Sequence, residues 1–307
     1  MIKICKKKRI RYYILLFLLP ALIVYTFFMT LPLINSLILS FYSGKGLIPD
    51  QFVGFANYIK LFTKSPFNKM FFNAFWNNVK FFVMVTIFQN VTGFVMAVMV
   101  TRKFRASTFF RRFFFLPVTL SVIVTGFLFS LMLNPIWGFI DKIIRTIGLG
   151  FLIRPWLGDS LTALPAISLV VAWQYLGMPI LFFTAAIDGI DSEIFESANL
   201  DGAGILATVR YIIFPLILPV IGIVMILTFV SIFTGFDIIY AMATSRGEPA
   251  YSTDIFGTLF YRSAFSAVAR GYWGMGMGAT IASVMFIIVL LGVLFWLFLF
   301  MRKKERD

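Results

Sequence analysis

Six long segments without a single charged residue constrain this chain more than any other feature. They lie near residues 13–40, 81–101, 113–133, 161–187, 211–236 and 279–301. A bilayer core about 30 Å thick needs roughly 20 apolar residues of helix to cross it. The sequence therefore predicts an all-α membrane protein, with six transmembrane helices in one transmembrane domain over residues 13–301.

The composition excludes several other classes of protein. Of the 307 residues, 60% are hydrophobic and 13% are charged, which is incompatible with a water-soluble domain. The chain has no His and one Cys, so it lacks the residues for a zinc site or a disulfide framework. A net charge of +14 on a polar domain would indicate a nucleic-acid-binding protein. Here the Lys and Arg residues instead lie in short gaps between apolar segments. We therefore expect no nucleic-acid partner.

The distribution of Lys and Arg predicts the orientation in the membrane. Of the 27 Lys and Arg residues, 16 lie in segments on one side of the predicted spans. These short segments are the tail at 1–12, residues 102–112, residues 188–210 and the tail at 302–307. Basic residues concentrate in short cytoplasmic segments, so both tails are predicted to be cytoplasmic. The first apolar segment is too long for a cleaved signal peptide, which favours an uncleaved first span.

The cytoplasmic segment 188–210 departs from this pattern because it is acidic. It contains Asp188, Asp191, Glu193, Glu196 and Asp201 against Arg210 alone. Residues 191–203 are typical of a short helix, with Asp or Ser as N-cap and Gly202 as terminator. Ile194, Phe195 and Ala198 share one face of that helix. Such a helix suits the groove of a partner protein, or it lies against the chain's own basic loops.

The apolar segments lack the groups that would drive transport. None contains an ionisable residue of the kind that couples a proton or sodium gradient to motion, and the chain has no G-x-x-x-x-G-K-[S/T] phosphate-binding loop. Their polar residues are uncharged, and six stand out: Gln89, Asn90, Gln174, Tyr175, Thr228 and Ser231. These residues either form hydrogen bonds between helices or line a pathway for a neutral, hydroxyl-rich solute. Any energy for uphill transport must come from another chain, so no enzymatic activity is expected here.

Several motifs occur in order along the chain. Glu196, Ala198, Asp201, Gly202, Ala203, Ile212 and Pro215 match the pattern E-A-A-x-x-D-G-A-x5-F-x-x-I-x-L-P, with departures at Ser197, Val209 and Phe214. Residues 53–58, 109–117, 134–138 and 247–272 match further segments of the same family. The chain thus resembles the integral-membrane permeases of binding-protein-dependent ABC importers, in the carbohydrate-uptake branch that includes maltose, glycerol-phosphate and multiple-sugar permeases.

The resemblance implies a fold like that of type I importer permeases, with residues 188–210 as the loop that couples to a separate ATPase. In that arrangement Glu196 pairs with a basic ATPase residue. Ile194, Phe195 and Ala198 fill the ATPase groove, and Gly202 allows the sharp turn after the coupling helix. Asp201 and Ala203 belong to the same motif.

The resemblance also implies partners and a location. The expected partners are a second permease, usually a different chain, a dimer of ATPase subunits that binds ATP and Mg²⁺, and an extracytoplasmic solute-binding protein. No cofactor is expected on this chain. The solute-binding protein would dock on residues 49–73 and 237–278, or these two loops pack against each other instead. The expected function is import of a sugar or oligosaccharide across a bacterial plasma membrane. The alternatives are a polyol or glycerol phosphate as solute, or a channel or transporter that needs no ATPase.

Overall fold

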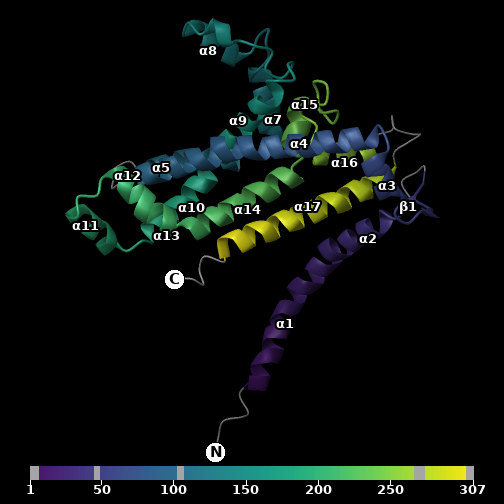
Figure 1. Cartoon of the computed structure of the whole chain (residues 1–307), viewed down its shortest axis with the longest axis horizontal. Helices are drawn as coiled ribbons and strands as arrows, with labels where there is room; N and C mark the ends of the chain where they lie inside the picture. Colours follow the sequence, from purple (N-terminus) through teal and green to yellow (C-terminus); the bar gives the residue numbers. More distant parts are fainter. Residues whose placement is uncertain (1–6, 45–48, 102–106, 266–273, 302–307) are drawn as a thin grey trace, which may run out of the picture.

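The computed structural model describes residues 7–44, 49–101, 107–265 and 274–301, and these residues are mostly helical (Figure 1). The predicted tails at 1–12 and 302–307 lie partly or wholly outside the described residues. The same holds for part of the predicted cytoplasmic gap 102–112 and of the predicted outer segment 237–278.

Three continuous helical segments are long and apolar enough to cross a membrane: Leu16–Leu39, Phe67–Val100 and Met275–Phe300. The first covers the second half of α1 (Lys7–Tyr25), a π-helical turn (Thr26–Thr30) and α2 (Leu31–Leu39). The second comprises α4 (Phe67–Val85), a π-helical turn (Thr86–Val91) and α5 (Thr92–Val100). The third lies within α17 (Met275–Met301).

Three further pairs of helices reach the necessary length only together, and each pair is bent. α6 (Ser107–Phe115) and the 3-10 turn Leu116–Thr119 meet α7 (Val122–Met132) at 94°. α9 (Ala163–Tyr175) meets α10 (Gly177–Asp188) at 48°. α12 (Ile205–Thr208), a π-helical turn (Val209–Ile213) and α13 (Phe214–Leu216) meet α14 (Leu218–Thr234) at 70°. The described residues thus hold three membrane-length helices, or up to six if each bent pair is one span.

Proline explains the bends that the apolar pattern did not predict. Pro117 lies in the turn before α7, Pro179 lies near the start of α10, and Pro215 and Pro219 flank the junction of α13 and α14. A proline cannot donate its backbone hydrogen bond and its ring clashes with the preceding turn of helix. An uncharged run of residues therefore identifies a membrane segment without showing whether its helix is straight.

The helix of the second predicted span begins at Phe67, well before the expected residue 81. Its first part carries Asn68, Lys69, Asn77, Asn78 and Lys80, which made it look like a polar loop. Every third or fourth residue is nevertheless buried: Phe67, Phe71, Ala74, Asn78 and Phe81. That spacing is typical of one face of an α-helix. Lys80 is therefore an exposed residue within a continuous helix and does not mark a helix end.

The shorter elements lie at opposite ends of the bundle (Figure 1). One end carries α11 (Ser192–Leu200) and α12. The other carries α3 (Ala56–Thr63), α16 (Phe256–Phe265), and strand β1 (Tyr42–Ser43), which pairs antiparallel with β2 (Gln51–Phe52). The remaining elements are α8 (Phe139–Thr146), a 3-10 turn (Gly150–Leu152) and α15 (Asp237–Ala243).

The buried apolar residues form two clusters. The larger one joins α4, α9, α14, α16 and α17, with Phe81, Phe256 and Ile281 almost fully buried. The smaller one lies between α5, α10 and the start of α14, around Ala97, Phe183 and Ile217. By contrast, none of the first membrane-length segment is buried, and Figure 1 shows α1 splayed away from the other helices. The bundle thus forms a core without its first helix.

Candidate functional site

A cavity of about 190 Å³ lies among the middle helices, where α9 bends into α10. Its polar lining residues are Gln89, Tyr175, Thr228 and Ser231, contributed by the π-helical turn after α4, by α9 and by α14. The remaining lining is apolar and includes Pro179 of α10. A neighbouring cavity of about 110 Å³ shares Tyr175 and Ser231 and extends to Asp237. The bent helices therefore bring four of the six predicted pathway residues together.

Asn90 lies beside this cavity but is engaged with another helix. Its side-chain nitrogen donates a hydrogen bond to the Thr228 hydroxyl at 3.0 Å, and that hydroxyl also lies 2.9 Å from the Val224 carbonyl. Both Asn90 and Thr228 are buried. Of the two interpretations open for Asn90, the structure favours a hydrogen bond between helices. Thr228 serves that bond and also lines the cavity.

Gln174 and Tyr175 are neighbours in sequence but lie in different surroundings. Gln174 is fully buried, and its Nε2 donates to the carbonyl of Leu120 at 3.1 Å, at the bend between α6 and α7. Its Oε1 has no hydrogen-bond partner among the described residues. Successive residues of a helix point about 100° apart, so neighbours in sequence serve different surfaces. Gln174 holds the bend, and Tyr175 faces the cavity.

The acidic segment forms α11, and its local sequence explains both ends of the helix. Asp191 is the N-cap, and its carboxylate accepts a hydrogen bond from the Glu193 backbone N–H at 3.1 Å. At the other end Gly202 has φ +74, its N–H donates to Asn199, and the N–H of Ala203 donates to Ala198. This pair of bonds is a Schellman motif, which favours glycine at the left-handed position. Gly202 thus ends the helix and turns the chain back toward α12.

The two faces of α11 differ from those expected. Ala198 is buried and Phe195 packs against the smaller apolar cluster of the chain itself. Ala198 therefore faces the bundle and Phe195 packs partly on it, so neither is as exposed as a side chain that fills a partner's groove is expected to be. The exposed apolar residues are Ile194 and, at 90% exposure, Leu200. Leu200 shares the outer face with Glu193 and Glu196, since residues three and four apart align on a helix.

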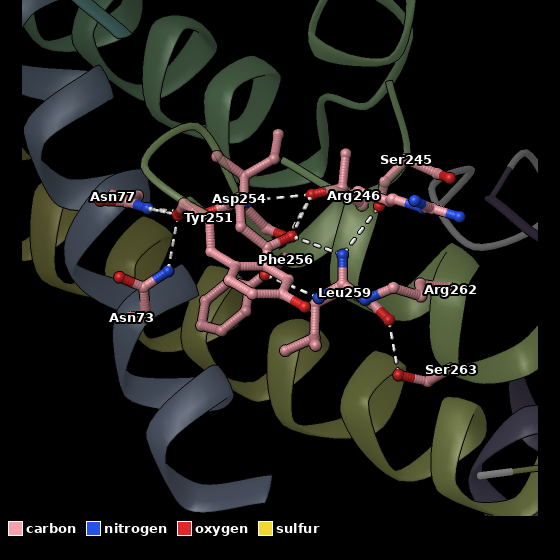
Figure 2. Close-up of polar contacts among 12 residues, drawn as sticks. Asn73, Asn77, Ser245, Arg246, Tyr251, Asp254, Phe256, Leu259, Arg262 and Ser263 are labelled. Atoms are coloured by element: carbon pink, nitrogen blue, oxygen red, sulfur yellow. Dashed lines mark hydrogen bonds and ion pairs between the residues drawn. The ribbon is translucent and has the colours of Figure 1, made fainter. Parts of the chain in front are cut away.

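A polar network fixes the opposite end of the bundle (Figure 2). Asp254 and Arg262 form an ion pair at 2.8 Å, with side-chain exposures of 0% and 14%. Arg262 also donates to the Ser245 carbonyl at 2.7 Å. Burial raises the pKa of Asp254, and the Arg262 guanidinium and the Thr258 hydroxyl partly offset that rise. Arg262 thus ties α16 both to Asp254, which lies just before this helix, and to the segment after α15.

Asparagines of α4 join the same network to the cavity wall. Asn73 and Asn77 both donate to the Tyr251 carbonyl, at 2.8 and 3.1 Å (Figure 2). Asn78 donates to the carbonyl of Ile232, which lines the cavity, and accepts from the backbone N–H of Phe256. Residue 73 and the segment around 251 therefore pack on each other, which favours mutual packing over a free docking surface at this point. This network was not predicted from the sequence, although the helical spacing of Asn73 and Asn77 is a signal for it.

Bent apolar helices around a small cavity, with an acidic helix at one end, define a membrane-embedded transport subunit. Residues 89–306 match the family model described as the inner membrane component of binding-protein-dependent transport systems. The chain belongs to this family, the permease subunits of ABC transporters, as the motifs had indicated.

Named relatives match nearly the whole chain. The probable ABC transporter permease protein YurN of Bacillus subtilis is 32% identical over 94% of this chain and 96% of its own length. The multiple sugar-binding transport system permease protein MsmF of Streptococcus mutans is 32% identical over 89% of this chain and 90% of its own length. Among solved structures, a bacterial ABC transporter that imports the polysaccharide alginate has a chain with a TM-score of 0.79 at 21% identity, over 97% of this chain and 98% of that one. This structural likeness supports the type I permease fold.

Proposed function

We propose that this chain is the permease subunit of an ABC importer for a sugar or oligosaccharide. The observation that carries the proposal is that the uncharged polar residues Gln89, Tyr175 and Ser231 line one cavity. Amide and hydroxyl groups bond to sugar hydroxyls, and an aromatic ring covers the C–H surface of a sugar. The names of several relatives add support, since they include a lactose permease of Rhizobium radiobacter and a permease for starch degradation products of Thermoanaerobacterium thermosulfurigenes.

The charges at the cavity favour a neutral solute over glycerol phosphate. Asp237 borders the neighbouring cavity, and no Lys or Arg is among the lining residues of either. A carboxylate near the path repels an anion. A polyol remains the alternative solute of the same class. An ATPase-independent channel is a second alternative, and it predicts uptake that continues without ATP.

The rest of the importer is proposed to come from other chains. A second permease, in a heterodimer, completes the pathway, and a solute-binding protein delivers the solute at the end that carries α16. A dimer of ATPase subunits binds ATP and Mg²⁺, so this chain has no cofactor. Counting each bent pair as one span gives six spans, with both termini on the cytoplasmic side of a bacterial plasma membrane.

The outer face of α11 is the proposed contact with the ATPase. Glu193, Glu196 and Leu200 are exposed together on this face, while Phe195 and Ala198 hold the helix to the bundle. Closure of the ATPase dimer then moves α11, and the helices packed on it, as one rigid body. Rigid-body rocking of the helices opens the cavity to alternate sides of the membrane.

Copurification tests the assembly and the contact together. The tagged full-length chain should copurify from gently solubilised membranes of its source with a second permease and an ATPase, identified by mass spectrometry. Glu196→Lys should reduce the recovered ATPase several-fold at low salt, because it reverses a charge on the contact face. Lys142→Glu on α8 is a matched charge reversal at the opposite side and should leave recovery unchanged. Recovery of the chain alone would contradict the proposed function, and unchanged recovery with Glu196→Lys would contradict the ion pair.

Filling the cavity tests the solute pathway. Ser231→Trp places a large ring in a space of about 190 Å³, so we expect uptake of the solute to fall at least tenfold. The measurement is uptake of radiolabelled solute into proteoliposomes that hold the whole transporter. Ile223→Trp, on an exposed face of the same helix, is the control and should transport normally. Normal uptake by the Ser231 variant would place the pathway elsewhere.

A further inference from the structure

A further cavity, of about 420 Å³, lies between α6 and α10, away from the residues that line the solute pathway. Arg111 and Arg112 line one end of it. Its apolar lining comes from Phe115 and Leu116 on one side and from Ile180 and Leu181 on the other. The cavity therefore combines a cationic end with an apolar body.

Close packing of the two helices explains why this hollow exists. A Cβ atom on Gly177 would lie 2.5 Å from the carbonyl oxygen of Phe114 and 2.7 Å from the Cα of Phe115. Since Gly177 has no side chain, the backbones of α6 and α10 meet there without anything between them. The longer side chains on either side of this contact then form the walls of the cavity.

The cationic end carries more positive charge than its partner neutralises. Arg111 forms an ion pair with Asp188 at 2.9 Å, and its Nε is buried without a hydrogen-bond partner in the described part of the chain. Arg112 is exposed, and its side chain forms no hydrogen bond or ion pair with the described residues. Two guanidinium groups thus face one carboxylate, which leaves one positive charge at the mouth of the cavity.

The cavity lies on the side of α10 that faces away from the solute pathway. Gly177, Ile180 and Leu181 line this cavity, whereas Met178, Pro179 and Phe182 line the pathway cavity. At about 100° per residue, the two sets are centred roughly 150° apart around the helix. The second permease is expected on the pathway side, so the opposite side faces the bilayer.

The depth of the cavity matches a lipid that enters from the membrane surface. Asp188 is the last residue of α10, and the coupling helix begins only four residues later. Ile180 lies eight residues before Asp188, which corresponds to about 12 Å along the helix. The arginines therefore lie at headgroup level and the apolar body lies at the level of the acyl chains.

We propose that this cavity binds an anionic phospholipid. The phosphate lies at Arg111 and Arg112, and one acyl chain runs along Leu116, Ile180 and Leu181. Basic pockets between membrane helices on the cytoplasmic side are suited to lipid headgroups, because the arginines supply charge at a membrane surface that is already anionic. The proposal rests on the proposed function, because the place of the second permease sets which side of α10 faces the bilayer and the proposed topology sets the leaflet.

A lipid at this place joins two elements that the transport cycle moves. It touches α6, directly before the 94° bend, and α10, which leads into α11. A bound lipid therefore stabilises one relative position of α6 and α10. We expect the ATP-dependent uptake of the whole transporter to rise when anionic lipid is added to a neutral bilayer.

The binding test titrates the purified protein, with any subunits that accompany it, against phosphatidylglycerol or phosphatidylcholine in mixed micelles, and counts bound lipids by native mass spectrometry. Phosphatidylglycerol should be retained preferentially. Arg112→Gln should reduce this preference about fivefold, since it removes the one guanidinium group of the pair that no carboxylate neutralises. Leu181→Trp fills the apolar body and should reduce the retention of phosphatidylglycerol without changing any charge.

The control is Arg154→Gln, which removes an exposed arginine near the other end of the bundle and should leave the preference unchanged. Equal retention of the two lipids would overturn the proposal, as would an unchanged preference in Arg112→Gln. Inorganic phosphate at the same concentration should not displace the lipid. Displacement would assign the arginines to a free anion and would also overturn the proposal. None of these results affects the outcome of the copurification test. The lipid site can therefore be disproved without disproving the proposed importer, whose own failure would appear in the copurification test.

Discussion

Replacing Gly202 by Arg should abolish uptake and association with the ATPase, while the chain remains in the membrane. Gly202 has φ +74, and a side chain there would meet no atom of this chain within 4 Å. The variant therefore costs about 1–2 kcal/mol of backbone strain without any internal clash. The new side chain projects from the end of α11, where the proposed ATPase contact lies. We expect the copurified ATPase to fall at least tenfold, measured by quantitative mass spectrometry.

Gly148 provides a matched control for this substitution. It ends α8 with φ +78, its N–H bonds to Arg145 and the next N–H bonds to Ile144, and it also has open space around it. Gly148→Arg thus carries the same strain in the same Schellman motif at a site far from α11, and it should retain the ATPase. Gly202→Asn, which tolerates a positive φ and is short, should keep most of the association. Normal uptake by Gly202→Arg would contradict the role of α11 in coupling.

Replacing Arg262 by Leu should destabilise the chain by about 3–5 kcal/mol, because it leaves the fully buried carboxyl of Asp254 without its partner. Burial already raises the pKa of Asp254, and loss of the guanidinium raises it further. A carboxyl whose pKa is higher in the folded state binds more protons when folded. Its contribution to stability is therefore largest below the pKa of the unfolded chain, about 3.9, and is lost as the pH rises through the folded value. The variant should be less impaired at pH 5 than at pH 8, measured by the midpoint of thermal unfolding in detergent.

Two further variants separate the lost ion pair from the lost arginine side chain. Asp254→Asn in the Arg262→Leu background removes the stranded carboxyl, so it should recover most of the stability and abolish the pH dependence. Arg246→Leu changes an exposed arginine in the same segment and should have little effect. An Arg262→Leu protein as stable as the unmodified chain at pH 8 would show that the ion pair does not hold this end of the bundle.

The sequence was sufficient for the features that depend on local chemistry. Uncharged runs indicate membrane segments because charge is costly in hydrocarbon, and the motif around Gly202 predicted both the helix α11 and its end. The membership of the permease family, predicted from the same motif, is confirmed.

The features that were missed depend on which surfaces meet in three dimensions. The start of α4 is polar in sequence and therefore resembles a loop. In the structure Asn77 and Asn78 form hydrogen bonds to segments more than 150 residues away in the chain. Likewise, a helical wheel groups Phe195 with Ile194 but cannot tell which of them faces the bundle. Gln174 was assigned to the pathway for its chemistry, and only the bend at Leu120 explains its actual contact.

The exposed first helix has a consequence for how mutations in the chain should be interpreted. Within the segment Leu16–Leu39, α2 packs on α17, but α1 adds no residue to the buried core, so the remaining helices are folded without α1. A substitution on its surface alters what the subunit touches and leaves its internal stability nearly unchanged. Substitutions in this helix should lower the yield of assembled transporter. Substitutions around Phe81 and Phe256, which are buried, should instead lower the stability of the isolated chain.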